Sequence, residues 1–303
     1  MRDIENKVAF ITGGASGIGL GMAQAFLKAG MRVVVADVRE DHLMDAVGVL
    51  GGGSRLHALR VDVSDRAALK SAAEQAERVF GHVHVLCNNA GVGLLGGAKA
   101  VTYDDWDWGL EVNLGGVVNG MQTFLPRMLA HGEGAHIVNT ASIGAVLPGP
   151  GGIVYLTAKT AVMALSEALK NDLLTDNIGV TVLLPGPTRT RIHEVAKLRP
   201  ARFQGTGVRD LERRLEKEPL FQNGTDPFLV GERVLEAIRR DELFVFTHND
   251  FKEGVALRFA SILSCFPAGP VDPERARNFG FPVVNEIYRD VLCRNESAGS
   301  GTD

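Results

Sequence analysis

Short, almost wholly apolar runs alternate with longer segments of helical periodicity over most of the chain. The short runs are rich in Val, Ile and Leu, which is typical of strands buried on both faces of a parallel sheet. Their alternation with helices predicts an α/β fold with a doubly wound, Rossmann-like parallel sheet and helices on both faces. We expect seven strands, at Lys7–Thr12, Met31–Asp37, Arg55–Asp62, Val83–Asn88, Ala135–Ala141, Ile178–Leu184 and Leu243–Thr247.

The longer segments have the apolar spacing of amphipathic helices. One of them contains Pro126, and we expect an interruption there because proline lacks the N–H that a helix interior needs. Right-handed crossovers place the C-terminal ends of the parallel strands on one sheet edge, where ligands bind in this architecture. The first expected helix follows the first strand and ends at about Ala29. Further helical segments are expected at His42–Leu50, Arg66–Phe80, Asp105–Leu129, Ile153–Leu174, Val208–Leu215, Arg233–Arg240 and Phe251–Leu263.

The pattern changes after Leu184. The following stretch, 185–227, is rich in Pro, Gly and charge, and the tail holds one more apolar patch at Phe279–Leu292. No internal repeat is visible. We expect a single domain over residues 1–265 with a long insertion at 188–226, followed by a C-terminal extension at 266–303.

Composition narrows the function classes. The 303 residues include 32 Lys+Arg and 36 Asp+Glu, for a formal net charge of −4, which argues against a nucleic-acid partner. Hydrophobic residues make up 45% and charged residues 22%, which excludes a disordered chain. The N-terminus lacks a signal pattern, and no apolar run approaches the roughly 18 residues of a membrane helix, so no membrane association is expected.

Three widely spaced cysteines, Cys87, Cys265 and Cys293, form no CxxC pair. They support neither a zinc ribbon nor a disulfide framework, so a reduced, cytoplasmic setting is the simplest expectation. No cluster of His, Asp and Glu has convincing metal-ligand spacing, and no metal site is expected.

A Gly-rich turn, Thr12–Gly19, lies between the first expected strand and the first helix. The unpaired N–H groups and positive dipole end of that helix suit a pyrophosphate. The spacing G-x-x-x-G-x-G differs from the G-x-G-x-x-G fingerprint, and no Lys follows as in a Walker A loop. Asp37 ends the second strand, where an acid can bind the adenosine ribose hydroxyls. The plainer alternative is a tight turn with Asp37 starting a helix.

Asp37 also bears on the choice of cofactor. A carboxylate repels the 2′-phosphate of NADP, because the two groups carry like charges in a confined site. Val38 is neutral, although Arg39 is close enough to reach such a phosphate. We therefore expect NAD rather than NADP.

Tyr155 and Lys159 have i,i+4 spacing at the start of a helix and so share one face. Ser142 follows the fifth strand, and Asn113 lies in the preceding helix. A phenol has a pKa near 10, and a nearby cation, from Lys159 or a nicotinamide ring, favours its ionised form. Such a tyrosinate can remove an alcohol proton while hydride leaves carbon, and Ser142 can hydrogen-bond the developing alkoxide.

Each of these residues has an ordinary explanation when it is taken alone. Tyr155 and Lys159 can form a surface pair, Ser142 a helix cap, and Asn113 a buried amide that satisfies backbone groups. Their joint order behind a dinucleotide loop favours catalysis. A methyltransferase shares the loop and the acid but has no need of Tyr155 and Lys159. A catalytically silent NAD-binding regulator would be expected to lack one of Ser142, Tyr155 and Lys159.

These motifs together resemble the short-chain dehydrogenase/reductase family, in its single-domain branch. The resemblance covers about Asn6 to Thr247. It rests on Thr12–Gly19, Asp37, Asp62-Val63, Asn88-Asn89-Ala90-Gly91, Asn113, Ser142, Tyr155-x-x-x-Lys159 and Pro185-Gly186. It implies a homodimer or homotetramer assembled through the helices at 105–130 and 153–175.

The resemblance also implies the role of each residue. Tyr155 would be the acid/base, Lys159 would bind the nicotinamide ribose, Asn113 would hold a water in the proton relay, and Ser142 would complete the catalytic set. The Gly-rich turn would bind the cofactor through Gly13, Ser16, Gly17, Ile18 and Gly19, with Asp37 on the ribose. Further cofactor contacts would come from Asp62 and Val63 at the adenine, Asn89, Ala90 and Gly91 beside the central strand, and Pro185, Gly186, Thr188 and Thr190 at the nicotinamide.

A narrower resemblance, carried by Tyr103–Trp108, His136–Ser142 and Arg191–Glu194, points to a bacterial subgroup. That subgroup includes the Cα-dehydrogenases of lignin aryl-ether breakdown, which oxidise benzylic alcohols with NAD. We therefore expect a small-molecule substrate, a bulky apolar secondary alcohol with a benzylic alcohol as the specific candidate. Another lipophilic substrate or a polyol is the alternative.

Residues 188–226 would form the substrate lid. Within Arg189–Gln222, nine basic and five acidic residues predict either a site for an anionic group or, as we prefer, a solvated helix face. His193 is either a substrate ligand or a packed histidine. The apolar walls of the pocket would come from Leu94, Leu95, Val146, Leu147 and Phe203.

Overall fold

The computed structural model describes residues 1–217, 222–279 and 283–299. It divides into two compact units, Met1–Asn249 and Asp250–Asp303. This division lies before the boundary at 265 that the sequence suggested. Both large hydrophobic clusters consist of residues that precede Asn249, whereas the helix that opens the second unit contains no buried residue.

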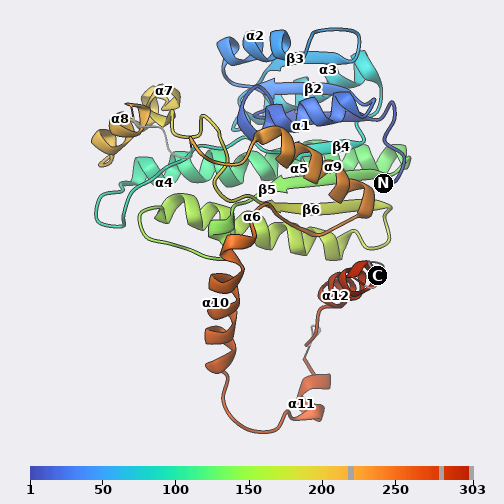
Figure 1. Ribbon diagram of the computed structural model, residues 1–303, viewed down its shortest axis with the longest axis vertical. Helices are drawn as coiled ribbons and strands as arrows, with labels where there is room; N and C mark the ends of the chain where they lie inside the picture. Colours follow the sequence, from blue (N-terminus) through green and yellow to red (C-terminus); the bar gives the residue numbers. More distant parts are fainter. Residues whose placement is uncertain (218–221, 280–282, 300–303) are drawn as a thin grey trace. The chain divides into compact units, whose positions relative to one another are not determined.

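The first unit is built on one seven-stranded sheet with the order β3-β2-β1-β4-β5-β6-β7 (Figure 1). All six neighbouring pairs are parallel. The prediction of a doubly wound, Rossmann-like sheet of seven strands is thereby confirmed. The strands are β1 (Val8–Thr12), β2 (Arg32–Asp37), β3 (Leu56–Arg60), β4 (Val85–Asn88), β5 (Ala135–Thr140), β6 (Ile178–Leu184) and β7 (Phe244–Phe246).

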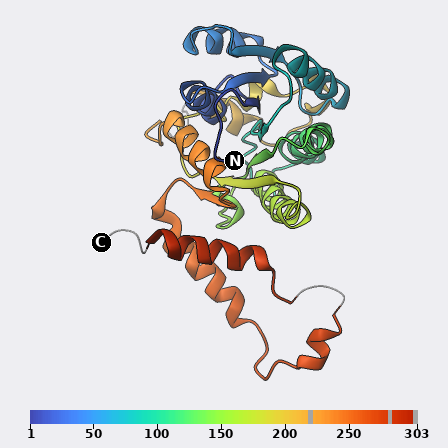
Figure 2. The ribbon, with the colours of Figure 1, turned by 90° about the vertical axis from the view of Figure 1, so that its right-hand side faces the viewer.

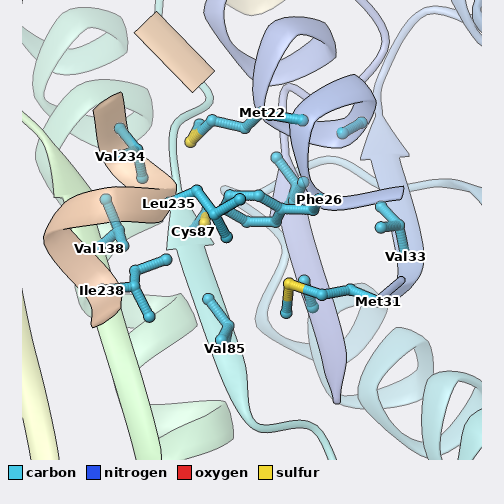
Figure 3. Close-up of a cluster of buried hydrophobic side chains, with 14 of the residues drawn as sticks. Met22, Phe26, Met31, Val33, Val85, Cys87, Val138, Val234, Leu235 and Ile238 are labelled. Atoms are coloured by element: carbon cyan, nitrogen blue, oxygen red, sulfur yellow. The ribbon is translucent and has the colours of Figure 1, made fainter. Parts of the chain in front are cut away.

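Helices cover both faces of this sheet (Figure 2). One face packs against α1 (Gly17–Lys28), α2 (Glu40–Val49) and α9 (Pro227–Arg240), through residues such as Phe26 and Val234 (Figure 3). The other face packs against α3 (Arg66–Phe80), α5 (Gly116–His131) and α6 (Ile153–Asp172), through residues such as Leu69 and Phe124. Every residue of β1, β4 and β5 is buried, which explains the apolar run of β1, whereas β5 also buries the polar His136, Asn139 and Thr140.

Two glycines allow α1 and α9 to pack backbone against backbone. A Cβ added to Gly21 would lie 2.0 Å from the carbonyl oxygen of Pro227, and one added to Gly231 would lie 2.2 Å from that of Gly21. No other residue type fits at such a distance, so the close packing of these two helices depends on glycine at both positions.

The predicted interruption at Pro126 is wrong. Pro126 lies inside α5, and both it and Gln122, whose carbonyl loses its helical partner, are exposed, so water can take over that bond. The break occurs earlier, where a π-helical turn, η1 (Glu111–Gly115), separates α5 from α4 (Tyr103–Leu110). Such turns are frequent at functional sites, and this one contains Asn113.

The segment after β6 contains α7 (Val195–Leu198), the short turn η3 (Ala201–Phe203) and α8 (Arg209–Lys217). The helix α8 begins one residue later and ends two residues later than the predicted helix Val208–Leu215. Two further short helical turns are η2 (Ile143–Ala145) and η4 (Asn249–Phe251).

The second unit contains α10 (Lys252–Ser264), α11 (Pro273–Arg277) and α12 (Glu286–Gly299). Part of the predicted apolar patch Phe279–Leu292 lies outside the described residues. Within the described part of the chain, no helix combines the length and apolar character needed to cross a bilayer.

Candidate active site

The turn between β1 and α1 brings backbone amides close to a common point. Gly13 and Gly17 adopt φ values of +60° and +49°, which favour glycine. A Cβ at Gly19 would lie 2.1 Å from the carbonyl oxygen of Gly13. Ser16 caps α1 without a side-chain hydrogen bond, and no acid lies in the first turn, where Ile18 is half-buried. The N-terminal amides of α1 are therefore suited to bind an anion.

Asp37 ends β2 beside this turn and is 8% exposed. Its carboxylate accepts hydrogen bonds from the backbone N–H of Ala15, at 3.3 Å, and of Arg39, at 3.1 Å. Burial raises the pKa of Asp37, and these hydrogen bonds work in the opposite direction. The carboxylate thus lies next to the Gly-rich turn, as a ribose ligand should.

Two further predicted cofactor residues follow β3. The Asp62 carboxylate accepts hydrogen bonds from the Ser64 N–H, at 2.9 Å, and the Ser64 hydroxyl, at 2.7 Å. Val63 is buried against Gly116, where an added Cβ would come within 2.7 Å of it. Both residues therefore lie at the carboxyl end of the strand, in ordered positions.

A polar network ties together the ends of β1, β4 and β5. The Asn89 and Ala90 N–H groups donate to the Thr12 hydroxyl at 2.9 and 3.1 Å, and the Asn89 amide donates to the Thr12 carbonyl at 3.2 Å. The Thr140 hydroxyl donates to the Asn89 side chain, also at 3.2 Å. Sequence reasoning missed Thr12 and Thr140. The available signal was a hydroxyl residue at the last position of each strand, after a wholly apolar run in β1 but directly after Asn139 in β5.

Ser142, Tyr155 and Lys159 come together at the same edge. The Ser142 hydroxyl accepts a hydrogen bond from the Gly144 N–H at 3.1 Å and also hydrogen-bonds Tyr155. The Lys159 ammonium donates to the Thr140 carbonyl at 2.7 Å and lies 5.7 Å from the centre of the Tyr155 ring. The three side chains are therefore positioned by β5, the turn after it and α6.

The electrostatics of this cluster differ from the sequence-based expectation. Burial raises the pKa of Tyr155, and only the hydrogen bond to Ser142 opposes it. Burial also lowers the pKa of Lys159, to about 8. The Lys159 ammonium, which was expected to lower the pKa of Tyr155, donates to the Thr140 carbonyl and lies 5.7 Å from the centre of the Tyr155 ring. An ionised Tyr155 therefore needs a further positive charge in the site.

Asn113 is fully buried in η1. Its amide oxygen accepts from the Val92 N–H and its amide nitrogen donates to the Val92 carbonyl, each at 3.0 Å. A Cβ on Gly91 would lie 2.7 Å from that oxygen and 3.5 Å from the Lys159 ammonium. The Asn113 side chain thus acts as the buried amide of the plainer alternative. A water in a proton relay would have to use its main-chain carbonyl.

The segment after β6 lies against the phosphate-binding turn. The Gly186 N–H donates to the Thr247 hydroxyl at 3.0 Å, which fixes the segment just after Pro185. The Thr188 hydroxyl is buried and donates to the Gly186 carbonyl at 3.0 Å. A Cβ at Gly17 would approach the Thr190 methyl group to 2.8 Å. The segment that carries these predicted nicotinamide ligands therefore lies close to the Gly-rich turn in space.

The lid is anchored through a buried charge. Arg199, whose side chain is 0% exposed, donates to Asp105 at 2.8 Å and also to Glu212. Its guanidinium lies 4.6 Å from the centre of the Trp108 ring. The preferred interpretation of the lid charges as a solvated face is therefore wrong for Arg199, which is neutralised inside the protein. His193 is also buried, and within the described residues its Nδ1 has no hydrogen-bond partner.

A Gly-rich turn, an acid after β2 and a Ser–Tyr–Lys cluster on one sheet edge define a dinucleotide-dependent oxidoreductase. A family profile described as short chain dehydrogenase matches residues 7–200. The chain belongs to the short-chain dehydrogenase family, as the motifs indicated.

Particular relatives narrow the comparison. A C alpha-dehydrogenase of Sphingobium sp. strain SYK-6 is 38% identical over 284 residues, covering 91% of this chain and 92% of the relative. A Burkholderia phymatum short chain dehydrogenase/reductase, solved in complex with NAD, has a TM-score of 0.81 at 34% identity, covering 90% of this chain and all of that one (100%). The apo form of LigO from Sphingobium sp. strain SYK-6 has a TM-score of 0.73 at 36% identity, and each chain is covered over its full length (100%). These relatives support the resemblance to the Cα-dehydrogenase subgroup.

Proposed function

We propose that this protein is an NAD-dependent dehydrogenase that interconverts a secondary alcohol and its ketone, with Tyr155 as the acid/base. The observation that carries the proposal is the contact of Ser142, Tyr155 and Lys159 at the sheet edge that also holds the N-terminus of α1. The catalytic and cofactor residues that we assign to this edge come from eight separate segments of the chain.

The residues present fit NAD. Gly13 and Gly19 approach backbone atoms and Gly17 approaches the Thr190 side chain so closely that no side chain fits at these positions, which suits a tight turn around a pyrophosphate. Asp37 suits the ribose hydroxyls, Asp62 and Val63 suit the adenine, and the segment Pro185–Thr190 suits the nicotinamide, together with Asn89, Ala90 and Gly91. Bound NAD supplies the hydride acceptor and, in its oxidised form, a positive ring.

Tyr155 takes the proton from the substrate hydroxyl, and Ser142 donates a hydrogen bond to the same oxygen. Ser142 is already oriented for this by the Gly144 N–H. Burial raises the pKa of Tyr155, and bound NAD would supply, beside Lys159, a positive charge that favours the ionised phenol. Lys159 holds the nicotinamide ribose, and the main-chain carbonyl of Asn113 holds a relay water.

The proposed substrate is a bulky, largely apolar secondary alcohol, with a benzylic alcohol of an aryl ether as the leading candidate. The relative from Sphingobium is named a C alpha-dehydrogenase, which supports this choice. The expected wall residues are buried, as Leu94 and Val146 are, or half-buried, as are Leu95, Leu147 and Phe203. An apolar pocket with a few convergent polar groups suits such a substrate.

The test is a panel of secondary alcohols with NAD, followed by the absorbance of the reduced cofactor. We expect aryl carbinols to be oxidised and small hydrophilic polyols to be ignored. Turnover of polyols alone would remove the substrate assignment and leave the acid/base assignment standing. No cofactor reduction with any alcohol, and no reoxidation with any ketone, would contradict the proposed reaction.

Two coarser features belong to the same proposal. A homodimer or homotetramer through α4, α5 and α6 is expected from the family, and sedimentation at several protein concentrations checks it. A cytoplasmic location stays a prediction from the cysteines, which are present as thiols in the structure.

A further inference from the structure

Arg39 lies two positions after Asp37, at the place where an arginine binds the 2′-phosphate in NADP-dependent proteins of this architecture. Its backbone N–H donates to the Asp37 carboxylate at 3.1 Å. A guanidinium is a strong phosphate ligand, because its N–H groups match two phosphate oxygens. Asp37 and Arg39 therefore favour opposite cofactors, and the structure must decide between them.

The charge of Arg39 is already engaged by other carboxylates. Its Nε donates to Asp41 at 2.7 Å, and a second nitrogen also binds Asp41. Its Nη1 lies 3.7 Å from a carboxylate oxygen of Glu194. The hydrogen bond to Asp41 and the nearby charges of Asp41, Glu194 and Asp37 raise the pKa of Arg39, while burial opposes this.

Glu194 is distant in sequence and comes from the lid. The segment that carries it passes the phosphate-binding turn, where Thr190 meets Gly17, and ends beside α2, where Arg191 lies 4.0 Å from Asp45. Two ion pairs therefore join this segment to α2 and its N-cap. The segment supplies the negative charge to Arg39 through Glu194 and the positive charge to Asp45 through Arg191. The Glu194 carboxylate is 17% exposed and also lies 3.2 Å from Lys197.

We propose that Glu194 is a cofactor-specificity residue, which holds Arg39 away from the position of a 2′-phosphate. The inference rests on the proposed NAD-dependent function. Within the described residues, the buried Nη1 of Arg39 has no hydrogen-bond partner, so it pairs with Glu194 by charge alone. NADP is rejected twice, by repulsion from Asp37 and by the occupation of Arg39. The second effect requires the lid segment to be in place.

The test is Glu194→Gln, which keeps the shape of the side chain and removes its charge. The dissociation constants of NAD and NADP are measured by calorimetry without substrate, and the ratio of kcat/KM for the two cofactors is measured with an alcohol. We expect the NADP-to-NAD ratio of kcat/KM to rise about tenfold and the NADP-to-NAD ratio of dissociation constants to fall about tenfold, with NAD affinity within about threefold of the original.

Asp210→Asn is the matched control, because it removes one charge from an exposed lid carboxylate that pairs with Arg213 at 4.0 Å. It should leave the ratio unchanged. Adding Arg39→Gln to Glu194→Gln should cancel the gain. An unchanged ratio in Glu194→Gln, an equal rise in Asp210→Asn, or a gain that survives Arg39→Gln would each overturn the inference. If the unsubstituted protein binds neither cofactor, the proposed function itself fails, which is a distinguishable result.

Discussion

The catalytic edge of the sheet and the lid are held in place by different forces. At the edge, Asn89, Asn113 and Lys159 are fixed by hydrogen bonds to the backbone of buried strands and of the loop after β4. In the lid, α7 and α8 are held by the buried charge of Arg199 and by a small apolar cluster that includes Val195.

This difference separates chemistry from recognition. Backbone hydrogen bonds to a seven-stranded sheet cannot be lost without unfolding the domain, so the reacting groups stay in register. The predicted lid depends on a few side chains, so we expect changes within it to leave the sheet undisturbed. A family with one reaction and many substrates is served by this arrangement.

Tyr155→Phe should have the largest effect, and it acts on the catalytic edge alone. The ring still packs, but the proton acceptor is lost, so kcat should fall by roughly 10²–10⁴-fold. The dissociation constant of NAD should change by less than about threefold. Steady-state kinetics and a NAD titration check this. Retention of more than about a tenth of the activity would contradict the role of Tyr155.

Arg199→Ala should have the largest effect on the lid. It leaves the buried carboxylates of Asp105 and Glu212 without their cation, which typically costs about 3–5 kcal/mol of stability. Urea unfolding measures this. The control is Arg202→Ala, which removes an exposed pair with Glu111 and should cost less than about 1 kcal/mol. Equal effects of the two substitutions would show that the buried charge does not anchor the lid.

Asp37→Ala should weaken NAD binding, because the carboxylate makes charge-assisted hydrogen bonds to the ribose that are worth about 1.5–3 kcal/mol each before competition from water. It should also narrow the preference over NADP. The value of kcat/KM for NAD measures the first effect, and the ratio of kcat/KM for the two cofactors measures the change in preference. A preference for NADP in the unsubstituted protein would contradict the assignment of Asp37.

A smaller effect is expected from pH, and it belongs to the sheet. Burial lowers the pKa of His136 to about 3 and also lowers that of His84. The unfolded chain, with a histidine pKa near 6.5, then binds more protons than the folded one. Stability is therefore full above about pH 6.5 and falls as the pH drops toward the folded-state values, by about 2 kcal/mol for His136 between pH 7 and pH 5.

Urea unfolding at the two pH values checks this, with His136→Gln as the control that removes the titration. The lid anchor should not add to the loss. Hydrogen bonds from Thr206 and Thr102 and the charge of Arg199 lower the pKa of Asp105 despite its burial, so the carboxylate stays ionised. A pH dependence that is unaltered in His136→Gln would show that another group is responsible.

The same contrast explains what could be predicted from the sequence. Most of the seven strands were found because a strand buried on both faces is largely apolar within a few consecutive residues, whereas the edge strands β3 and β7 are only partly buried. Tyr155 and Lys159 were found because i,i+4 spacing is local. The partners of Arg199 lie 94 and 13 positions away, and the Arg39–Glu194 pair joins two distant loops, so no local pattern reveals them.

Local signals also failed where tertiary structure overrides them. Pro126 lies within a continuous helix because its face of that helix is exposed to water. The helical hydrogen-bond pattern instead changes around Asn113, which is neither a proline nor a glycine. Burial raises the pKa of Tyr155, and the depth at which this ring lies is not contained in the sequence. These features follow from packing rather than from propensity.

The separation of chemistry from recognition is tested most directly by replacing Val195–Lys217 with a Gly-Ser linker. This change removes Arg199 and Glu212 together and leaves Glu194 and the catalytic edge intact. The account predicts that KM for an aryl carbinol rises by about tenfold or more, while the dissociation constant of NAD stays within about threefold. A loss of NAD affinity with an unchanged KM would contradict it.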